Sequence, residues 1–356
     1  MMKPVYISSI VVTSPQQHFE DDGFLQNVFG DDSGCLYVKE PNYRKYINPV
    51  AIRRMSKLLK MGISTGMNAL ERAGVQQPDA IITGTGRGSM VDMEAFLLSM
   101  IEMEEEALTP TSFIQSTYNS VNGWLALQTK SNGYNQTYVN RGASFELALF
   151  DAQMLLNETE EAQTALVGCF DEITPDYVRV KGKIGYWKEP APANLELLQK
   201  ADTPGTIAGE GAAFLTVTNN KENTLCSLLC IKMLQDATTD EVVHHANEIL
   251  TENNISLADI DVLLCGMNGD VNQQEVYTTM IGKAVANTSI AAFKHLCGEY
   301  DTSSGFATWI AAKLFELQEI PEILTVKRGR HERIKNILIV NHYILNSTSL
   351  ILLQAE

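Results

Sequence analysis

The sequence predicts a layered α/β fold made of two similar halves. Short apolar, β-prone segments alternate with amphipathic helical segments along most of the chain, which is the pattern of strands and helices packed in layers. The alternation starts again after Asn219-Asn220, and each half ends with two strands in succession. We therefore predict halves at residues 1–218 and 219–356, related by an internal duplication and built on mainly parallel sheets.

The first half contains the clearest helix of the chain. Apolar side chains recur at three- and four-residue steps between residues 51 and 73, and Gly74 supplies the stop signal. A second helix is predicted at about 89–107. A third, over 143–156, is apolar on nearly every side, so it belongs in the interior. Buried strands are predicted at 4–12, 79–83, 137–140, 165–169 and 212–217, with a long excursion at 174–208.

The second half repeats this order of elements. Strands are predicted at 225–233 and 260–266, and helices at 239–253, 272–286 and 303–318. Two strands near 335–341 and 347–353 complete it. The similarity of the halves rests on this pattern, because no sequence repeat is visible.

Composition and charge exclude several classes of function. The chain has 356 residues, with 27 Lys and Arg against 43 Asp and Glu, and a formal net charge of −16. Binding to nucleic acid or to a membrane surface is not expected at this charge. No apolar run reaches the roughly 20 residues of a spanning helix, and the first residues do not resemble a signal peptide, so we expect a cytoplasmic protein. Six dispersed cysteines predict neither a disulfide framework nor a metal site.

Several windows carry a family resemblance in a shared order. They are the helix end Leu70-Glu71-Arg72-Ala73-Gly74, the turn Gly84-Thr85-Gly86, the segment 109–119, the strand start Gly209-Glu210-Gly211-Ala212, and Lys294 to Glu299 followed by Gly305. Together they resemble the β-ketoacyl-acyl-carrier-protein synthases of the thiolase superfamily. The resemblance implies a thiolase-like fold with an α-β-α-β-α arrangement of layers, an acyltransferase ancestry and no cofactor.

An active member of that family uses a Cys nucleophile at the start of a buried helix, and usually two His that stabilise the enolate and oxyanion. Matching Asn140-Arg141-Gly142-Ala143-Ser144 to the nucleophile motif puts Gly142 at the Cys position. The first His position falls on Asn268, or on Gly266 in an ungapped count. The second falls on Glu299, whereas Lys294 is retained. The resemblance therefore implies no catalytic residue and no independent condensing activity.

A retained framework without these groups resembles a chain-length factor, a pseudoenzyme that pairs with an active ketosynthase. In that family the two subunits form a heterodimer across their central strands and neighbouring helices, and the factor helps to wall the acyl tunnel. The resemblance implies a role in polyketide, polyene or fatty-acyl biosynthesis, with acyl carrier protein engaged only indirectly. The implied tunnel and interface residues are Phe113, Gln115, Tyr118, Trp124, Thr137, Tyr138, Asn140 and Phe145. Plain core packing is the alternative for Trp124 and Phe145.

Two other functions stay open at this point. One is an active acyltransferase or hydrolase that uses Ser144, Cys169 or His295, with Glu299 or Glu146 as a base. The other is a homodimeric acyl-binding pseudoenzyme, which differs from a chain-length factor only in whether an active ketosynthase co-purifies. The family's glycine-rich C-terminal gate reads here Asn341-His342-Tyr343-Ile344-Leu345-Asn346, so we expect no mobile gating loop.

Overall fold

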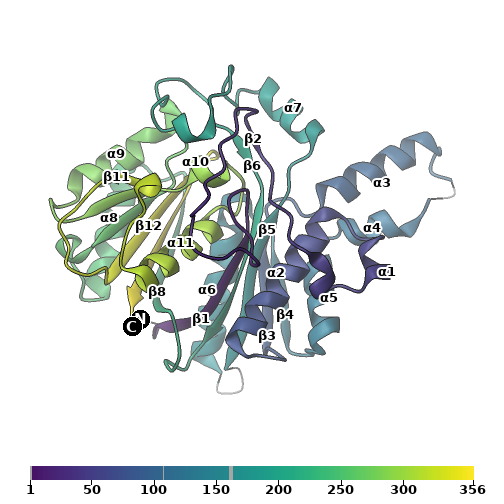
Figure 1. Ribbon diagram of the computed structural model, residues 1–356, viewed down its shortest axis with the longest axis horizontal. Helices are drawn as coiled ribbons and strands as arrows, with labels where there is room; N and C mark the ends of the chain where they lie inside the picture. The colour runs from purple at the N-terminus through teal and green to yellow at the C-terminus, as the bar shows by residue number, and fades with distance from the viewer. Residues whose placement is uncertain (1, 107, 160–162) are drawn as a thin grey trace.

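The computed structural model describes residues 2–106, 108–159 and 163–356, and its strands form two sets with the same order (Figure 1). In the first half the order is β4-β3-β5-β7-β1, and in the second it is β10-β9-β12-β13-β8 with β11 at the edge. In both sets the first three strands run parallel to one another and the other two are antiparallel to their neighbours. This repeated topology supports the predicted duplication; the boundary between residues 218 and 219 stays a prediction.

The strands are long near the middle of the molecule and short at its edges. The first set comprises β1 (Val5–Thr13), β3 (Ala80–Gly84), β4 (Tyr134–Tyr138), β5 (Thr164–Asp171) and β7 (Gly211–Thr218). The second comprises β8 (Cys226–Gln235), β9 (Val262–Cys265), β10 (Ser289–Ala292), β11 (Thr325–Lys327), β12 (Asn336–Tyr343) and β13 (Ser347–Ala355). A short pairing of Val5–Ile7 with Cys226–Leu228 joins them into one sheet of eleven strands among the described residues. A separate small sheet pairs β2 (Cys35–Leu36) with β6 (Ala208–Gly209).

The helices complete five layers. α6 (Ser144–Glu158) and α11 (Ser304–Leu317) lie in the middle, because each contacts strands of both halves. α2 (Lys57–Ala73) and α5 (Ser120–Thr129) cover the outer face of the first set, and α8 (Thr239–Glu252) and α9 (Gln274–Lys283) that of the second. The predicted α-β-α-β-α arrangement is therefore confirmed. The burial of α6 explains why its sequence is apolar almost all round.

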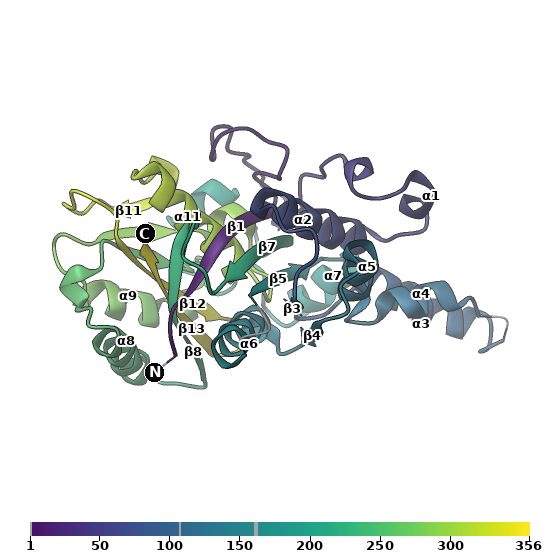
Figure 2. The same cartoon turned by 90° about the horizontal axis from the view of Figure 1, so that it is seen from below.

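The remaining elements lie outside these layers. They are the helices α1 (Pro49–Ile52), α3 (Met90–Glu102), α4 (Pro110–Ser116), α7 (Pro175–Lys183) and α10 (Lys294–Cys297), and 3-10 turns at Tyr43–Lys45, Arg141–Ala143, Asn194–Glu196, Leu257–Asp259, Val271–Gln273 and Glu322–Leu324. Figures 1 and 2 show α3 projecting from the body with α4 beside it.

The structure differs from the predicted elements in four ways. The sheet is mixed rather than mainly parallel, because β1, β7, β8 and β13 run antiparallel to their neighbours. The helix predicted at 51–73 breaks between α1 and α2, where the Gln115 side chain accepts the N–H of Ser56 and donates to the Arg54 carbonyl. Strand β10 was missed, since four residues carry too little pattern. The helix predicted at 89–107 ends at Glu102, and Ala107 lies outside the described residues.

Candidate functional site

The turn before α6 is held by its own side chains. Gly142 lies in the 3-10 turn Arg141–Ala143, after β4. Ser144 Oγ accepts the N–H of Asn140 and donates to the Arg141 carbonyl, both at 2.8 Å. Arg141 adopts a left-handed backbone with a φ of 48°, which is unfavourable for a residue with a side chain. The sequence thus places Gly142 where the first N–H groups of a buried helix point.

No space is left above Gly142 for a side chain. A Cβ built on Gly142 would lie 2.5 Å from Cγ of Tyr343, the last residue of β12. Tyr343 is itself only 2% exposed. The phenol ring therefore occupies the volume that any larger residue at Gly142 would need.

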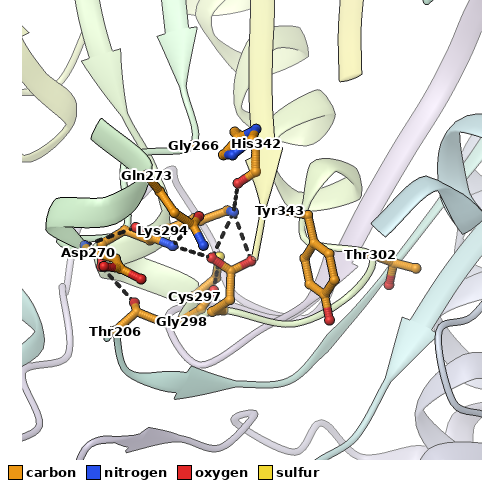
Figure 3. A network of polar contacts seen from close by, with 12 residues as sticks. Thr206, Gly266, Asp270, Gln273, Lys294, Cys297, Gly298, Thr302, His342 and Tyr343 are labelled. Carbon is orange, nitrogen blue, oxygen red and sulfur yellow. Dashed lines mark hydrogen bonds and ion pairs between the residues drawn. The ribbon is translucent and has the colours of Figure 1, made fainter. Parts of the chain in front are cut away.

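Lys294, Glu299 and Asn268 form one buried polar network. Figure 3 shows this network, with Lys294, Gln273 and Asp270 labelled in it. Lys294 Nζ lies 2.8 and 2.9 Å from the two carboxylate oxygens of Glu299, and both side chains are almost completely buried. Asn268 Nδ2 donates to Glu299 Oε2 at 2.7 Å. Burial raises the pKa of Glu299, while the Lys294 cation opposes that rise. The Glu299 carboxylate is therefore paired with a buried cation.

The remaining polar atoms of this network are also occupied. Asn268 Nδ2 also donates to Gln273 Oε1 at 3.1 Å, and its Oδ1 accepts the Asp270 N–H at 3.1 Å. Lys294 Nζ donates to the His342 carbonyl at 3.1 Å. Of the two residues considered for the first His position, Asn268 contacts Glu299, whereas Gly266 lies at the end of β9 beside Asn341. No side chain of the network is free to approach a ligand.

The side chains considered for the alternative activities are likewise buried. Cys169 is buried against Gly305, and burial raises the pKa of its thiol. His295 Nε2 bonds to the Ile323 carbonyl at 2.9 Å, and burial lowers the pKa of its ring to about 4. His295 lies on the short helix α10. Glu146 is buried and accepts from Ser349 Oγ at 2.7 Å.

Asp171 and Glu172 fasten loops to the end of β5. Asp171 accepts the backbone N–H groups of Gly86 and Thr302, at 2.9 and 3.0 Å. Glu172 accepts the Val91 N–H at 3.0 Å and thereby caps the first turn of α3. Burial raises the pKa of both carboxyls to about 7, and the nearby Asp301 contributes for Asp171. This arrangement suits a structural role better than acid–base catalysis.

We expect Glu172 to make stability depend on pH. Because burial holds its pKa near 7, above its ordinary value of 4.5, the folded state binds more protons than the unfolded state between these pH values. The free energy of unfolding then falls as pH rises through this window. In Glu172→Gln, the decrease in the free energy of unfolding between pH 5 and 8 is expected to be smaller by about 2 kcal/mol. Urea unfolding at each pH measures it. The exposed Glu252→Gln is the control; parallel curves for wild type and Glu172→Gln would contradict the assignment.

Exposed apolar side chains lie on α3, α4, α5, the edge strand β4 and the residues next to them. Leu127 is 74% exposed, and Phe113 is 53% exposed although its ring packs 5.3 Å from that of Phe96. Among the residues that the structure describes, β4 pairs only with β3, and its other edge has no strand beside it. Large exposed apolar patches of this kind mark interaction sites. We define the apolar face as Leu97, Leu98, Ile101, Phe113, Ile114, Tyr118, Trp124, Leu127, Tyr134 and Val139.

The predicted tunnel and interface residues divide into three groups. Phe113, Tyr118 and Trp124 are exposed on the apolar face, and Asn140 is exposed beyond β4. Thr137 and Tyr138 are half-buried in β4, and Gln115 bridges α1 and α2 through its amide. Phe145 is completely buried in the central core, so it belongs to the packing of this chain.

The residues that close the space above Gly142 were not predicted from the sequence. Tyr343 was noted only as part of an altered gate, and neither Arg87 nor Asp301 was singled out. Arg87 Nε lies 2.9 Å from Asp301 Oδ2, and its guanidinium stacks 4.7 Å from the centre of the Tyr177 ring. The sequence signal for this closure was Tyr343, a bulky residue where the family's gate has glycines.

Two kinds of feature are absent from the described residues. None of their helices has the length and apolar character needed to cross a membrane. No three or more of their His, Cys, Asp and Glu side chains gather as metal ligands.

Comparisons with known proteins agree on one family. The β-ketoacyl synthase N-terminal domain model matches residues 36–248. No curated protein sequence matches the chain. The fold is similar to the ishigamide ketosynthase/chain length factor, with a TM-score of 0.81, 15% identity and full coverage of both chains. It is also similar to a β-ketoacyl synthase from Burkholderia phymatum STM815, with a TM-score of 0.78, 14% identity and full coverage of both chains.

A third similar structure is that of a type II polyketide synthase acyl-carrier protein in complex with its ketosynthase bound to the hexaketide. Its TM-score is 0.75 at 14% identity, over 99% of this chain and 100% of that chain. Identities this low show a shared fold and not a shared activity.

Proposed function

This chain belongs to the β-ketoacyl synthase family, and from that premise we propose that it is a non-condensing, chain-length-factor-like subunit. It pairs with an active ketosynthase and helps to wall the acyl tunnel of that partner. The observation that carries the proposal is at the start of α6, where Gly142 offers no nucleophile and the Tyr343 ring fills the adjacent space.

The groups around Gly142 also fail to supply the electrostatics of condensation. Decarboxylation of a malonyl thioester needs donors aimed at the developing enolate oxygen. Here Asn268 Nδ2 already donates to Glu299 and Gln273, and the Lys294 cation already pairs with Glu299. Freeing Lys294 would leave the buried Glu299 carboxylate without its cation, which is strongly unfavourable. The subunit is thus suited to support a reaction in its partner.

The apolar face supports pairing with a partner. It combines exposed aliphatic and aromatic side chains with the unpaired edge of β4, and a partner strand placed there would extend the sheet. An active ketosynthase presents the same fold, so the two subunits can meet through equivalent surfaces. With a net charge of −16 on this chain, we propose that an acidic carrier protein docks chiefly on the partner.

Phe113 and Tyr118 are the proposed contributors to the tunnel wall. Each methylene buried in an apolar tunnel contributes about 0.8 kcal/mol, so side-chain bulk at its end decides which chain length fits. Phe113→Ala in the complex is expected to shift the product toward longer chains by at least one extension unit, measured by mass spectrometry of the released acyl groups. Val326→Ala, at an exposed residue outside the apolar face, is the control. An unchanged product with Phe113→Ala would remove Phe113 from the tunnel wall.

Co-expression tests the pairing directly. The chain is produced with the ketosynthase encoded nearest to its gene, and the mass of the purified species is measured by size exclusion with light scattering. A stable one-to-one complex is the expected result. A homodimer of this chain that excludes the ketosynthase would favour the acyl-binding pseudoenzyme instead.

Ser144, Cys169 and His295 are engaged in the hydrogen bonds and burial described above, so we do not propose an independent acyltransferase or hydrolase. The cytoplasmic location stays a prediction.

A further inference from the structure

Tyr343 closes the space over Gly142 from the side of the β12–β13 hairpin. We propose that Tyr343 is a fixed plug that keeps acyl groups out of this subunit's own former nucleophile pocket, so that acyl loading is confined to the partner. The identity of the excluded ligand rests on the proposed function. The closure itself rests on the contacts of Tyr343.

The ring is wedged between the start of α6 and a charged pair. Its Cγ and Cβ lie 2.5 and 2.6 Å from where a Cβ on Gly142 would stand. At its other end, the hydroxyl lies 3.5 Å from a guanidinium nitrogen of Arg87. Arg87 is in turn held by its ion pair with Asp301 and by the Tyr177 ring. The plug is therefore fixed at both ends of its side chain.

The backbone on both sides of the plug is also fixed. β12 and β13 stay in antiparallel register up to the pairs His342 with Thr348 and Tyr343 with Ser347. The His342 N–H donates to Tyr277 Oη at 2.8 Å, and the His342 carbonyl accepts from Lys294. His342 Nδ1 also bonds to Thr348 Oγ1 at 2.7 Å. A glycine-rich gate has none of these side-chain contacts and can move, whereas this hairpin holds the ring in place.

The Tyr343 ring also determines whether a cysteine introduced at position 142 could react. A cysteine at position 142 would stand at the N-terminus of α6, where helix N–H groups favour a thiolate. With Tyr343 in place, however, its Cβ and Sγ have no room, and no electrophile can approach the sulfur. Gly142→Cys alone is thus expected to give an inert or displaced thiol. Gly142→Cys with Tyr343→Gly is expected to give an accessible one, because the Cβ of residue 343 also lies too close to a Cβ at position 142.

Thiol labelling tests this expectation on the full chain. Cys35 and Cys230 are the partly exposed native cysteines, so both are first replaced by serine. Iodoacetamide labelling at position 142 is then followed by peptide mass spectrometry. We expect Gly142→Cys/Tyr343→Gly to react roughly tenfold faster or more than Gly142→Cys alone, because reactivity follows thiolate access. Gly142→Cys/Tyr343→Phe is the matched control and should stay slow. Equal rates for the single variant and the glycine double variant would overturn the proposal.

A thermal-unfolding cycle keeps the proposal testable if a labelled variant folds poorly. Gly142→Ala is expected to lower Tm when Tyr343 is present, because the new Cβ meets the ring. The same substitution in a Tyr343→Gly background, which also removes the Cβ of residue 343, should cost little or nothing. A Gly142→Ala chain with the Tm of the wild type would overturn the plug. Both measurements use this chain alone, so a failure here is distinct from a failure to pair with a ketosynthase.

Discussion

Replacing Lys294 by methionine is expected to lower the free energy of unfolding by about 3–5 kcal/mol, because it leaves the buried Glu299 carboxylate without its cation. Both side chains are essentially inaccessible to water, with Nζ and Oε1 2.8 Å apart. Urea unfolding at pH 8, where an unpaired carboxyl is most costly, measures the loss. Burial already raises the pKa of Glu299, so removing Lys294 should raise it further and make the loss larger at high pH than at low pH.

Two controls separate the buried pair from general effects of the substitution. Lys313→Met breaks a partly exposed pair with Glu316, with N and O 2.7 Å apart, and should cost at most about 1 kcal/mol. Adding Glu299→Gln to Lys294→Met removes the stranded charge and should recover much of the stability. If the single variant were as stable as the wild type, or the double variant no better than the single one, the network would not be the buried ion pair described here.

Charge on the apolar face is expected to abolish pairing with the ketosynthase. Leu127 is 74% exposed and Trp124 36% exposed, so glutamate at either position is compatible with the fold of the single chain. In a buried interface, the same glutamates would lose their hydration without gaining a partner. Leu127→Glu with Trp124→Glu should weaken the complex by on the order of 100-fold or more.

Size exclusion of the co-expressed proteins, followed by a concentration series, measures that weakening. Leu317→Glu places the same charge on an exposed leucine outside the apolar face and should leave the complex intact. Pairing that survives Leu127→Glu/Trp124→Glu would move the interface elsewhere. Circular dichroism of the isolated variants checks that their fold is unchanged.

The regular elements were predictable because their signals are local. The apolar period of α2, its Gly74 stop and the all-round apolarity of α6 are read within one segment. The family windows added the position of Gly142, since the start of α6 carries a recognisable order of residues. The short edge elements β10 and β11 lack such a signal, because three or four residues do not establish a period.

The closure of the pocket was not predictable in the same way. Tyr343 and Gly142 are 201 positions apart, and their contact depends on how the β12–β13 hairpin lies over the start of α6. The pairing of Lys294 with Glu299 was not predictable from the sequence, because α10 and the turn after it bring the two side chains together. The break between α1 and α2 likewise depends on Gln115, which is remote in sequence. Each case needs a tertiary contact that no local pattern carries.

A condensation assay tests the central claim most directly. Malonyl-carrier protein and an acyl primer are supplied to this chain alone, to the ketosynthase alone and to the purified complex, and carbon dioxide release and acyl products are both measured. The account predicts elongation by the complex and no turnover by this chain alone. Elongation or decarboxylation by this chain alone would contradict it, and would require a catalytic set other than Gly142, Asn268 and Glu299.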